Sequence, residues 1–123
     1  MRFFNVSGEE EKIPGLEAEY RGAHAIGVLK IGEDHMFFRS RLKWYVVPYS
    51  GVDRCFRRVR NVPAGLCCGR GSLDMESIVV SQNGRELAEI QMPGARAAVA
   101  AFEELKGKMP GAAFGRPEAE AKA

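Results

Sequence analysis

Basic residues gather in two neighbouring stretches of this chain, and they are the first candidates for binding chemistry. The members are Arg39, Arg41, Lys43, Arg54, Arg57, Arg58 and Arg60. Arginine suits a docking site for an acidic peptide, a phosphate or a nucleic acid, because its planar guanidinium donates paired hydrogen bonds to anionic oxygens. The alternative is a solvated face on which acidic residues pair with the arginines across strands. Asp53, Asp74 and Glu76 are the available partners.

We favour the solvated face, because exposed ion pairs reveal little about function. Alternation along a strand also sends Arg57 to the face opposite its basic neighbours, so the cluster does not form one patch. Tyr49 follows Pro48 in a loop and is expected at the surface. The candidate binding surface selected from the sequence is Lys43, Tyr49, Arg54, Arg58 and Arg60.

Cysteine and histidine residues raise the question of metal binding or thiol catalysis. The candidates are Cys55, Cys67, Cys68, His24 and His35. No Cys-x-x-Cys spacing is present, and adjacent thiols rarely both ligate one tetrahedral zinc ion. Thiol catalysis needs a histidine beside the cysteine in space, which sequence does not show. We therefore predict reduced, buried cysteines and a non-enzymatic chain with no metal, no cofactor and no catalytic residue.

Two further patterns have ordinary structural explanations. Gly69-Arg70-Gly71 lacks the third glycine of a dinucleotide-binding loop and the Lys-Ser/Thr pair of a P-loop, so it is interpreted as a turn. Aromatic residues between 37 and 56 could stack bases, but most are expected in the core. They are Phe37, Phe38, Trp44, Tyr45, Tyr49 and Phe56.

Length and composition are those of one globular domain. The chain has 123 residues, of which 46% are hydrophobic and 28% charged, with a formal net charge of +2. No apolar run approaches the roughly 20 residues of a membrane span. The amino end turns acidic at Glu9-Glu10-Glu11 before the apolar core of a signal peptide could form, so we expect a cytoplasmic protein.

Turn residues divide the middle of the chain into seven short strands. They are expected over 24–31, 35–39, 42–47, 52–60, 66–68, 73–81 and 85–92. Asn83-Gly84 is the clearest hairpin signal. From Ala95 to Lys108 the apolar period changes to about 3.6, which predicts an amphipathic helix with Ala98, Val99, Phe102 and Leu105 on one face.

The two ends of the chain fit this pattern less well. Residues 1–22 are interpreted as an amino-terminal arm with at most a short helical turn, since Ser7 and Glu10 form a capping-box pattern that Pro14-Gly15 interrupts. The domain spans 23–109. Residues 110–123, rich in Ala, Glu and Pro, are expected to form a disordered tail.

The order of these elements resembles the pleckstrin-homology-like superfold. The resemblance covers residues 24–109, and the stretches 31–39, 45–49, 55–59 and 81–91 look like small bacterial proteins of that superfold to which no activity is assigned. It implies a mainly β fold: a bent seven-stranded antiparallel sheet, or partly open barrel, capped by a carboxyl-terminal amphipathic helix. Phosphoinositide-binding members carry basic residues in the first hairpin loop. Here that loop is Gly32-Glu33-Asp34, which would repel phosphates, so phosphoinositide binding is not expected.

Three functions remain as hypotheses. The first is a binding or adaptor domain that recognises a peptide or protein, for instance by adding a strand to an open sheet edge. The second is a barrel that encloses a small apolar ligand or acts on it. The third is weak, salt-sensitive nucleic-acid binding through the arginine-rich strand, which we do not expect to dominate. Self-association is left open, because bent sheets have edges.

Overall fold

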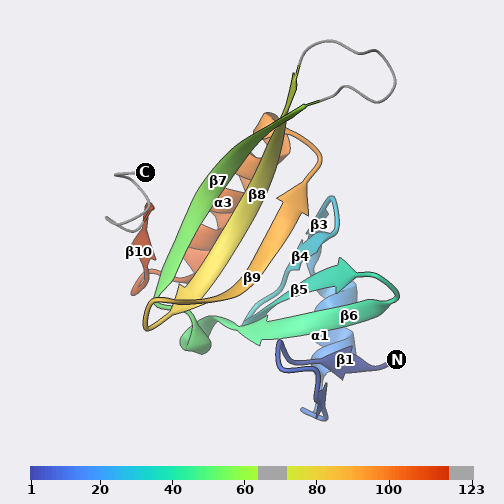
Figure 1. Cartoon of the computed structure of the whole chain (residues 1–123). Helices are drawn as coiled ribbons and strands as arrows, with labels where there is room; N and C mark the ends of the chain where they lie inside the picture. Colours follow the sequence, from blue (N-terminus) through green and yellow to red (C-terminus); the bar gives the residue numbers. More distant parts are fainter. Residues whose placement is uncertain (64–71, 117–123) are drawn as a thin grey trace.

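The fold is mainly β, with a carboxyl-terminal helix packed against the strands, as the sequence predicts (Figure 1). The computed structural model describes residues 1–63 and 72–116. The strand expected over 66–68, with Cys67 and Cys68, and the turn expected at 69–71 lie outside these residues. Within them, ten strands form two sheets of six and four strands, and the sheets do not close into a barrel.

The six-stranded sheet contains most of the amino-terminal half of the chain. In spatial order its strands are β2 (Glu10–Glu11), β1 (Phe3–Phe4), β6 (Lys43–Pro48), β5 (His35–Ser40), β4 (Leu29–Ile31) and β3 (His24–Ile26). Neighbours pair antiparallel except β1 with β6, which are parallel. The short 3₁₀ helix η1 (Tyr49–Gly51) leads from β6 towards the second sheet.

The four-stranded sheet is built on one long meander. Its order is β10 (Ala113–Phe114), β7 (Arg54–Pro63), β8 (Ser72–Gln82) and β9 (Arg85–Met92). At the β8–β9 turn, Asn83 and Gly84 have φ angles of 54° and 79°, the two positive values that a type I′ hairpin requires. The hairpin signal in the sequence is therefore confirmed.

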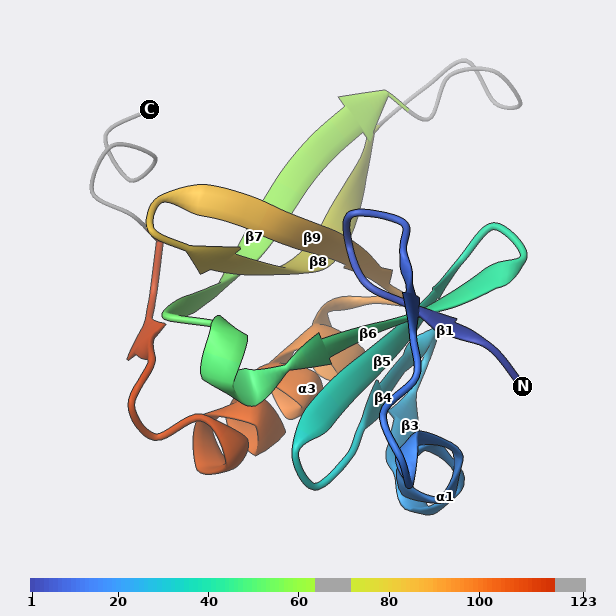
Figure 2. The same cartoon turned by 90° about the horizontal axis from the view of Figure 1, so that it is seen from below.

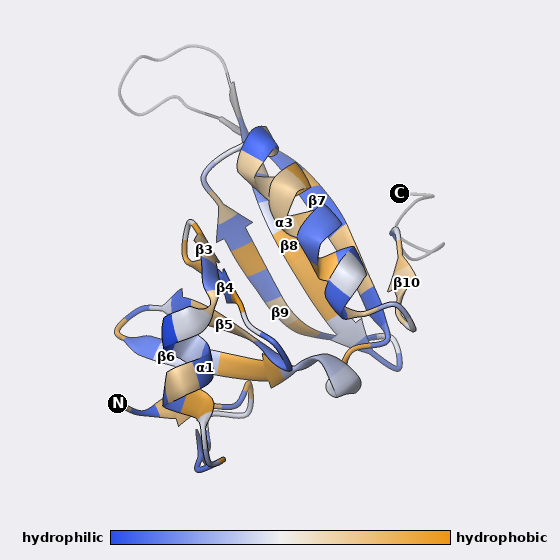
Figure 3. Cartoon of the chain, turned by 180° about the vertical axis from the view of Figure 1, so that it is seen from behind, coloured by the Kyte–Doolittle hydropathy of each residue, from blue (hydrophilic) through white to orange (hydrophobic). Residues whose placement is uncertain are grey.

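The main core lies where the two sheets and helix α3 (Ala95–Lys108) meet. Figures 2 and 3 show α3 along one face of the four-stranded sheet, with the six-stranded sheet beside it. Ala98, Ala101 and Leu105 are the buried residues of the helix. Phe102 is half-buried and packs on Phe114, with ring centroids 5.3 Å apart. The predicted stripe is wrong at Val99, which is exposed, because the helix is rotated towards Ala101.

A second core cluster covers the opposite face of the six-stranded sheet. It consists of Phe3 from β1, Leu16 from helix α1 (Leu16–Gly22), Phe37 from β5 and Val46 from β6. Residues 1–22 therefore supply two strands, a helix and two of these four buried side chains. The capping-box pattern does not begin a helix. Instead, the Asn5 carboxamide accepts hydrogen bonds from the backbone of Ser7 and Glu9 at the β1–β2 turn, and α1 begins after Gly15.

The single strand expected over 24–31 is a tight hairpin of β3 and β4. Gly27 makes the turn with a φ of 62°, a conformation that a residue with a Cβ rarely adopts. A Cβ at Gly27 would also come within 2.8 Å of the Pro93 ring. This close approach places the β3–β4 turn against the end of β9. At the carboxyl end, Ala113–Phe114 forms β10 within the stretch expected to be a tail.

Candidate functional site

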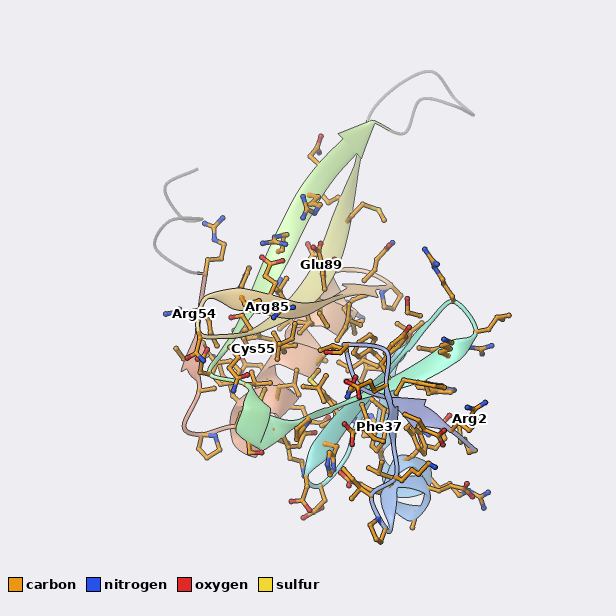
Figure 4. The ribbon with its side chains drawn as sticks, turned by 60° about the horizontal axis from the view of Figure 1, so that its bottom comes forward. Arg2, Phe37, Arg54, Cys55, Arg85 and Glu89 are labelled. Atoms are coloured by element: carbon orange, nitrogen blue, oxygen red, sulfur yellow. The ribbon has the colours of Figure 1, made fainter. Side chains whose placement is uncertain are left out.

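The five candidate surface residues do not form one surface, although Arg58 and Arg60 lie together. Lys43 begins β6, and its Nζ is 4.9 Å from the Phe4 ring centroid. Arg54 lies at the other end of the molecule, where its Nη1 donates to the Gly115 carbonyl at 3.0 Å (Figure 4). The expectation that Tyr49 is exposed is wrong. Its side chain is 8% exposed and its hydroxyl donates to the Gly32 carbonyl at 2.8 Å, because η1 turns the ring into the core.

Arg58 and Arg60 lie on the face of the four-stranded sheet that points away from α3. Arg58 pairs with Glu86 and, at 2.8 Å, with Glu89. Arg60 Nε lies 3.1 Å from Glu89 Oε2. Hydrogen bonds from Arg60 have the largest effect on the pKa of Glu89 and lower it. Burial raises this pKa, but the hydrogen bonds from Arg58 also lower it, so the pKa is lowered overall. We call Arg58, Arg60, Glu86 and Glu89 the acid–base cluster. It confirms that these arginines pair with acidic residues across strands, although the carboxylates come from β9.

The other acidic residues named from the sequence behave differently. Arg57 pairs with the buried Glu76 at 3.0 Å, and alternation along β7 places it on the face opposite Arg58, as predicted. Asp74 accepts a hydrogen bond from Asn61, and Asp53 accepts one from the backbone of Asn83. The arginines of β7 are thus already engaged, which does not favour nucleic-acid binding through this strand.

The acid–base cluster covers two apolar side chains on the outer face. Phe56 and Val79 are cross-strand neighbours, 1% and 0% exposed, and belong to neither core cluster. The Arg58 guanidinium lies 5.3 Å from the Phe56 ring centroid, within cation–π range. Arg58 is 12% exposed, so its stem and head exclude water from the ring. The cluster therefore fixes β9 to β7 across the sheet.

Sheet edges are the second feature of the surface. In the described chain the edge strands β2, β3 and β10 have two or three residues each, whereas β9 has eight. The outer side of β7 is also open beyond β10, but Arg57, Arg58, Arg60 and Pro63 are types that discourage strand pairing. No described residue pairs with the side of β9 away from β8, which is thus a long row of open backbone hydrogen-bonding groups.

A groove runs along this free side of β9. Its main part has a volume of about 570 Å³ and lies between residues 89–93 on one wall and the β3–β4 turn and residues 38–41 on the other. An adjoining hollow of about 200 Å³ shares Phe38, Ser40 and Glu89 and extends to Leu87 and Tyr45. Phe38 and Tyr45 stack with centroids 5.3 Å apart, which gives an apolar lining. We call the two hollows together the β9 groove.

The tip of the β5–β6 hairpin contributes two arginines to the main part of the groove. Arg39 and Arg41 are exposed, and neither side chain has an ion pair or a hydrogen bond with any described residue. Arg41 has a φ of 59° at the turn. The sequence grouped these residues with β7, but the fold places them against β9.

Each histidine is bonded to a carboxylate. His24 Nδ1 lies 2.6 Å from Glu104 Oε1, and His35 Nδ1 lies 2.8 Å from Glu19 Oε1. Glu19 Oε2 also accepts the backbone N–H groups of Asp34 and His35 at 2.8 and 2.7 Å. Burial raises the pKa of Glu19, but the hydrogen bonds from the His35 ring and from these two amides outweigh it, so the pKa is lowered overall. Glu19 therefore ties α1 to the β4–β5 turn.

Replacing Glu19 with glutamine should make the domain less stable at neutral pH by about 1–2 kcal/mol, because charged acceptors make stronger hydrogen bonds. A carboxyl whose pKa is lowered on folding stabilises the fold above its unfolded pKa of about 4.3 and loses that contribution as pH falls through the folded pKa. Urea midpoints of the two proteins should therefore converge at low pH. A constant difference between pH 7 and pH 3 would contradict the assignment.

The described cysteine is poorly suited to nucleophilic chemistry. Cys55 is fully buried, and burial raises the pKa of its thiol to about 12. The thiolate, which is the reactive form, is therefore scarce at neutral pH. Within residues 1–63 and 72–116 no three His, Cys, Asp or Glu side chains are grouped so that they could hold a metal ion. The described helices are too short or too polar to cross a bilayer.

Comparison with models of protein families, with curated proteins and with solved structures finds no match for this chain. The geometry of the chain itself is therefore the basis for a function. Sequence reasoning overlooked the β9 groove, because its walls come from segments about 50 residues apart. The available signals were Asn83-Gly84, which joins β9 to β8 as a hairpin, and Pro93-Gly94, which ends β9 before a helix and so leaves its other side without the next strand of a meander.

Proposed function

We propose that this chain is a non-enzymatic binding domain of pleckstrin-homology-like shape, which takes an extended segment of a protein partner into the β9 groove. One observation carries the proposal: an eight-residue edge strand lies beside a groove large enough for several extended residues. A segment there would complete the ladder of β9 with its own backbone. Phe38 and Tyr45 would pack against its side chains.

The remaining features fit binding better than catalysis. The thiol of Cys55 is buried and its pKa is raised, so this described cysteine is a poor nucleophile. Bulky side chains fill the space between the sheets and α3, among them the fully buried Leu29, Met36 and Ile78. This packing gives no support to the hypothesis of a barrel around a small ligand.

The proposal is tested with a displayed library of random ten-residue peptides, followed by NMR hydrogen exchange. Selected peptides should protect alternate amides of β9, those that point away from β8, while the amides of β3 and β10 exchange as before. Backbone pairing protects one amide in two along an edge, which makes the pattern diagnostic.

Two outcomes would overturn strand addition at β9. The library could yield no enriched peptide, or the enriched peptides could protect other parts of the domain and leave β9 unchanged. Protection of β9 in the chain alone, increasing with its concentration, would also contradict it, because a second copy would then be the occupant.

A further inference from the structure

The geometry points to an acidic occupant of the β9 groove: an extended segment whose carboxylates, at alternate positions, bind Arg39 and Arg41. This inference rests on the proposed function and specifies its partner. The two arginines lie on the wall opposite β9, so they would meet side chains of the segment while its backbone pairs with β9. The tip of the β5–β6 hairpin would then select acidic ligands.

The first support is that these two guanidinium groups have no partner in the described chain. Six other arginines do: Arg2, Arg21, Arg54, Arg57, Arg58 and Arg60 each bond to a carboxylate or a carbonyl. Arg85, Arg96 and Arg116 also have no partner among the described residues, but none of them lines the β9 groove. A guanidinium on a groove wall is partly removed from water once the groove is filled. A ligand that supplied no acceptor would leave its donors unmatched.

The second support is the state of the nearest carboxylate. Glu89 lies on the β9 wall of the same groove, but its two oxygens are held by Arg58 and Arg60. Hydrogen bonds from Arg60 lower its pKa, together with those from Arg58. Its charge is thus compensated on the outer face of the sheet. Glu89 therefore neither neutralises Arg39 and Arg41 nor strongly repels an acidic ligand.

The third support is the backbone of Arg41. Its φ is 59°, a conformation that glycine adopts freely. For a residue with a Cβ this conformation is unfavourable in free energy. Glycine would be the better residue for folding at this turn. An arginine that is exposed, unpaired and conformationally unfavourable contributes little to stability, which is typical of a functional position.

The spacing of the two arginines matches an extended ligand. Two residues of chain separate their Cα atoms by at most about 7 Å. In an extended segment, side chains at positions i and i+2 share one face and are separated by about the same length. Two carboxylates spaced in this way can therefore each accept a forked hydrogen-bond pair from one guanidinium.

The test uses a ten-residue peptide in which Glu alternates with Val and Thr, and the same peptide with Gln in place of Glu. Calorimetry or fluorescence anisotropy should show the Glu peptide binding roughly tenfold tighter at low salt, with the difference shrinking as salt rises. Arg39→Gln and Arg41→Gln should each weaken the Glu peptide several-fold, and the Arg39→Glu, Arg41→Glu double variant should abolish its binding. Arg116→Gln, which removes the same charge at the opposite edge of the sheet, should leave affinity unchanged.

Other anionic ligands serve as arms of the same experiment. A peptide with phosphothreonine in place of Glu and a twelve-nucleotide single strand of DNA are measured alongside. Binding of either in the absence of Glu-peptide binding would overturn the carboxylate inference. Equal affinity for the Glu and Gln peptides would also overturn it, yet would leave strand addition at β9 intact. Failure of every peptide, with no enrichment from the library, would remove both.

Arg41→Gly separates a binding role from a structural one. It should raise the urea midpoint, because glycine relieves the backbone at this φ, and it should weaken the Glu peptide several-fold. A lower midpoint with unchanged affinity would show that Arg41 serves the hairpin and would contradict the inference.

Discussion

Replacing Phe37 with alanine should lower the free energy of unfolding by about 3–5 kcal/mol. Phe37 is fully buried, and its ring centroid lies 5.3 Å from that of Phe3 and 5.5 Å from that of Tyr20. The substitution removes the side chain on which α1 packs against strands β1 and β5 of the six-stranded sheet (Figure 4). Because domains are marginally stable, a loss of this size is a large fraction of the total.

The only tryptophan of the chain reports on this region. Trp44 packs against Tyr20 of α1 with ring centroids 4.8 Å apart. Its emission should therefore shift to longer wavelength in the Phe37→Ala protein before global unfolding in urea. Leu42→Ala is the matched control, since Leu42 belongs to the same hairpin but is 89% exposed. If both variants lost similar stability, residues 1–22 would be a loose arm.

Phe56→Ala should produce a loss of similar size, about 3–5 kcal/mol, although Phe56 lies on the face that points away from the main core. The ring is buried beneath Arg58, and Val79 lies beside it. Its removal leaves a cavity under the acid–base cluster. Arg58 would then lose the surface that holds its guanidinium between Glu86 and Glu89. We therefore expect β9 to become more mobile as well.

Urea unfolding measures the stability, and hydrogen exchange of β9 measures the local effect. Val59→Ala is the control on the same strand, because Val59 is about half-exposed and should lose less than about 1 kcal/mol. Phe56→Ala should also weaken any peptide selected for the β9 groove. Equal losses for the two variants would show that the outer face is not a second apolar layer.

The strands and the last helix were predictable because local patterns determine them. β9 and α3 have the bounds expected from their apolar periods, and Asn83-Gly84 forms the expected hairpin. Short-range steric preferences dominate at such turns, so few residues are enough to predict them. The division of 24–31 into β3 and β4 was not predicted, because a single glycine such as Gly27 is compatible with a continuous strand as well as with a turn.

The amino-terminal region and the carboxyl-terminal strand could not be predicted in the same way. β1, β2 and β10 are two residues long, too short to produce a period. They form because long-range partners are available: β1 pairs with β6, and β10 with β7. Tyr49 was placed at the surface because a loop usually is exposed, but η1 directs it inward to the Gly32 carbonyl.

The candidate site shows the same division. The sequence by itself determined the mainly β class, the final helix and the alternation that separates Arg57 from Arg58, because these depend on the period of neighbouring residues. Only the tertiary structure decided which arginines have partners, which strand is left as an edge, and which wall faces it. Those facts depend on distances between segments remote in the chain, and the packing of two sheets and α3 fixes these distances.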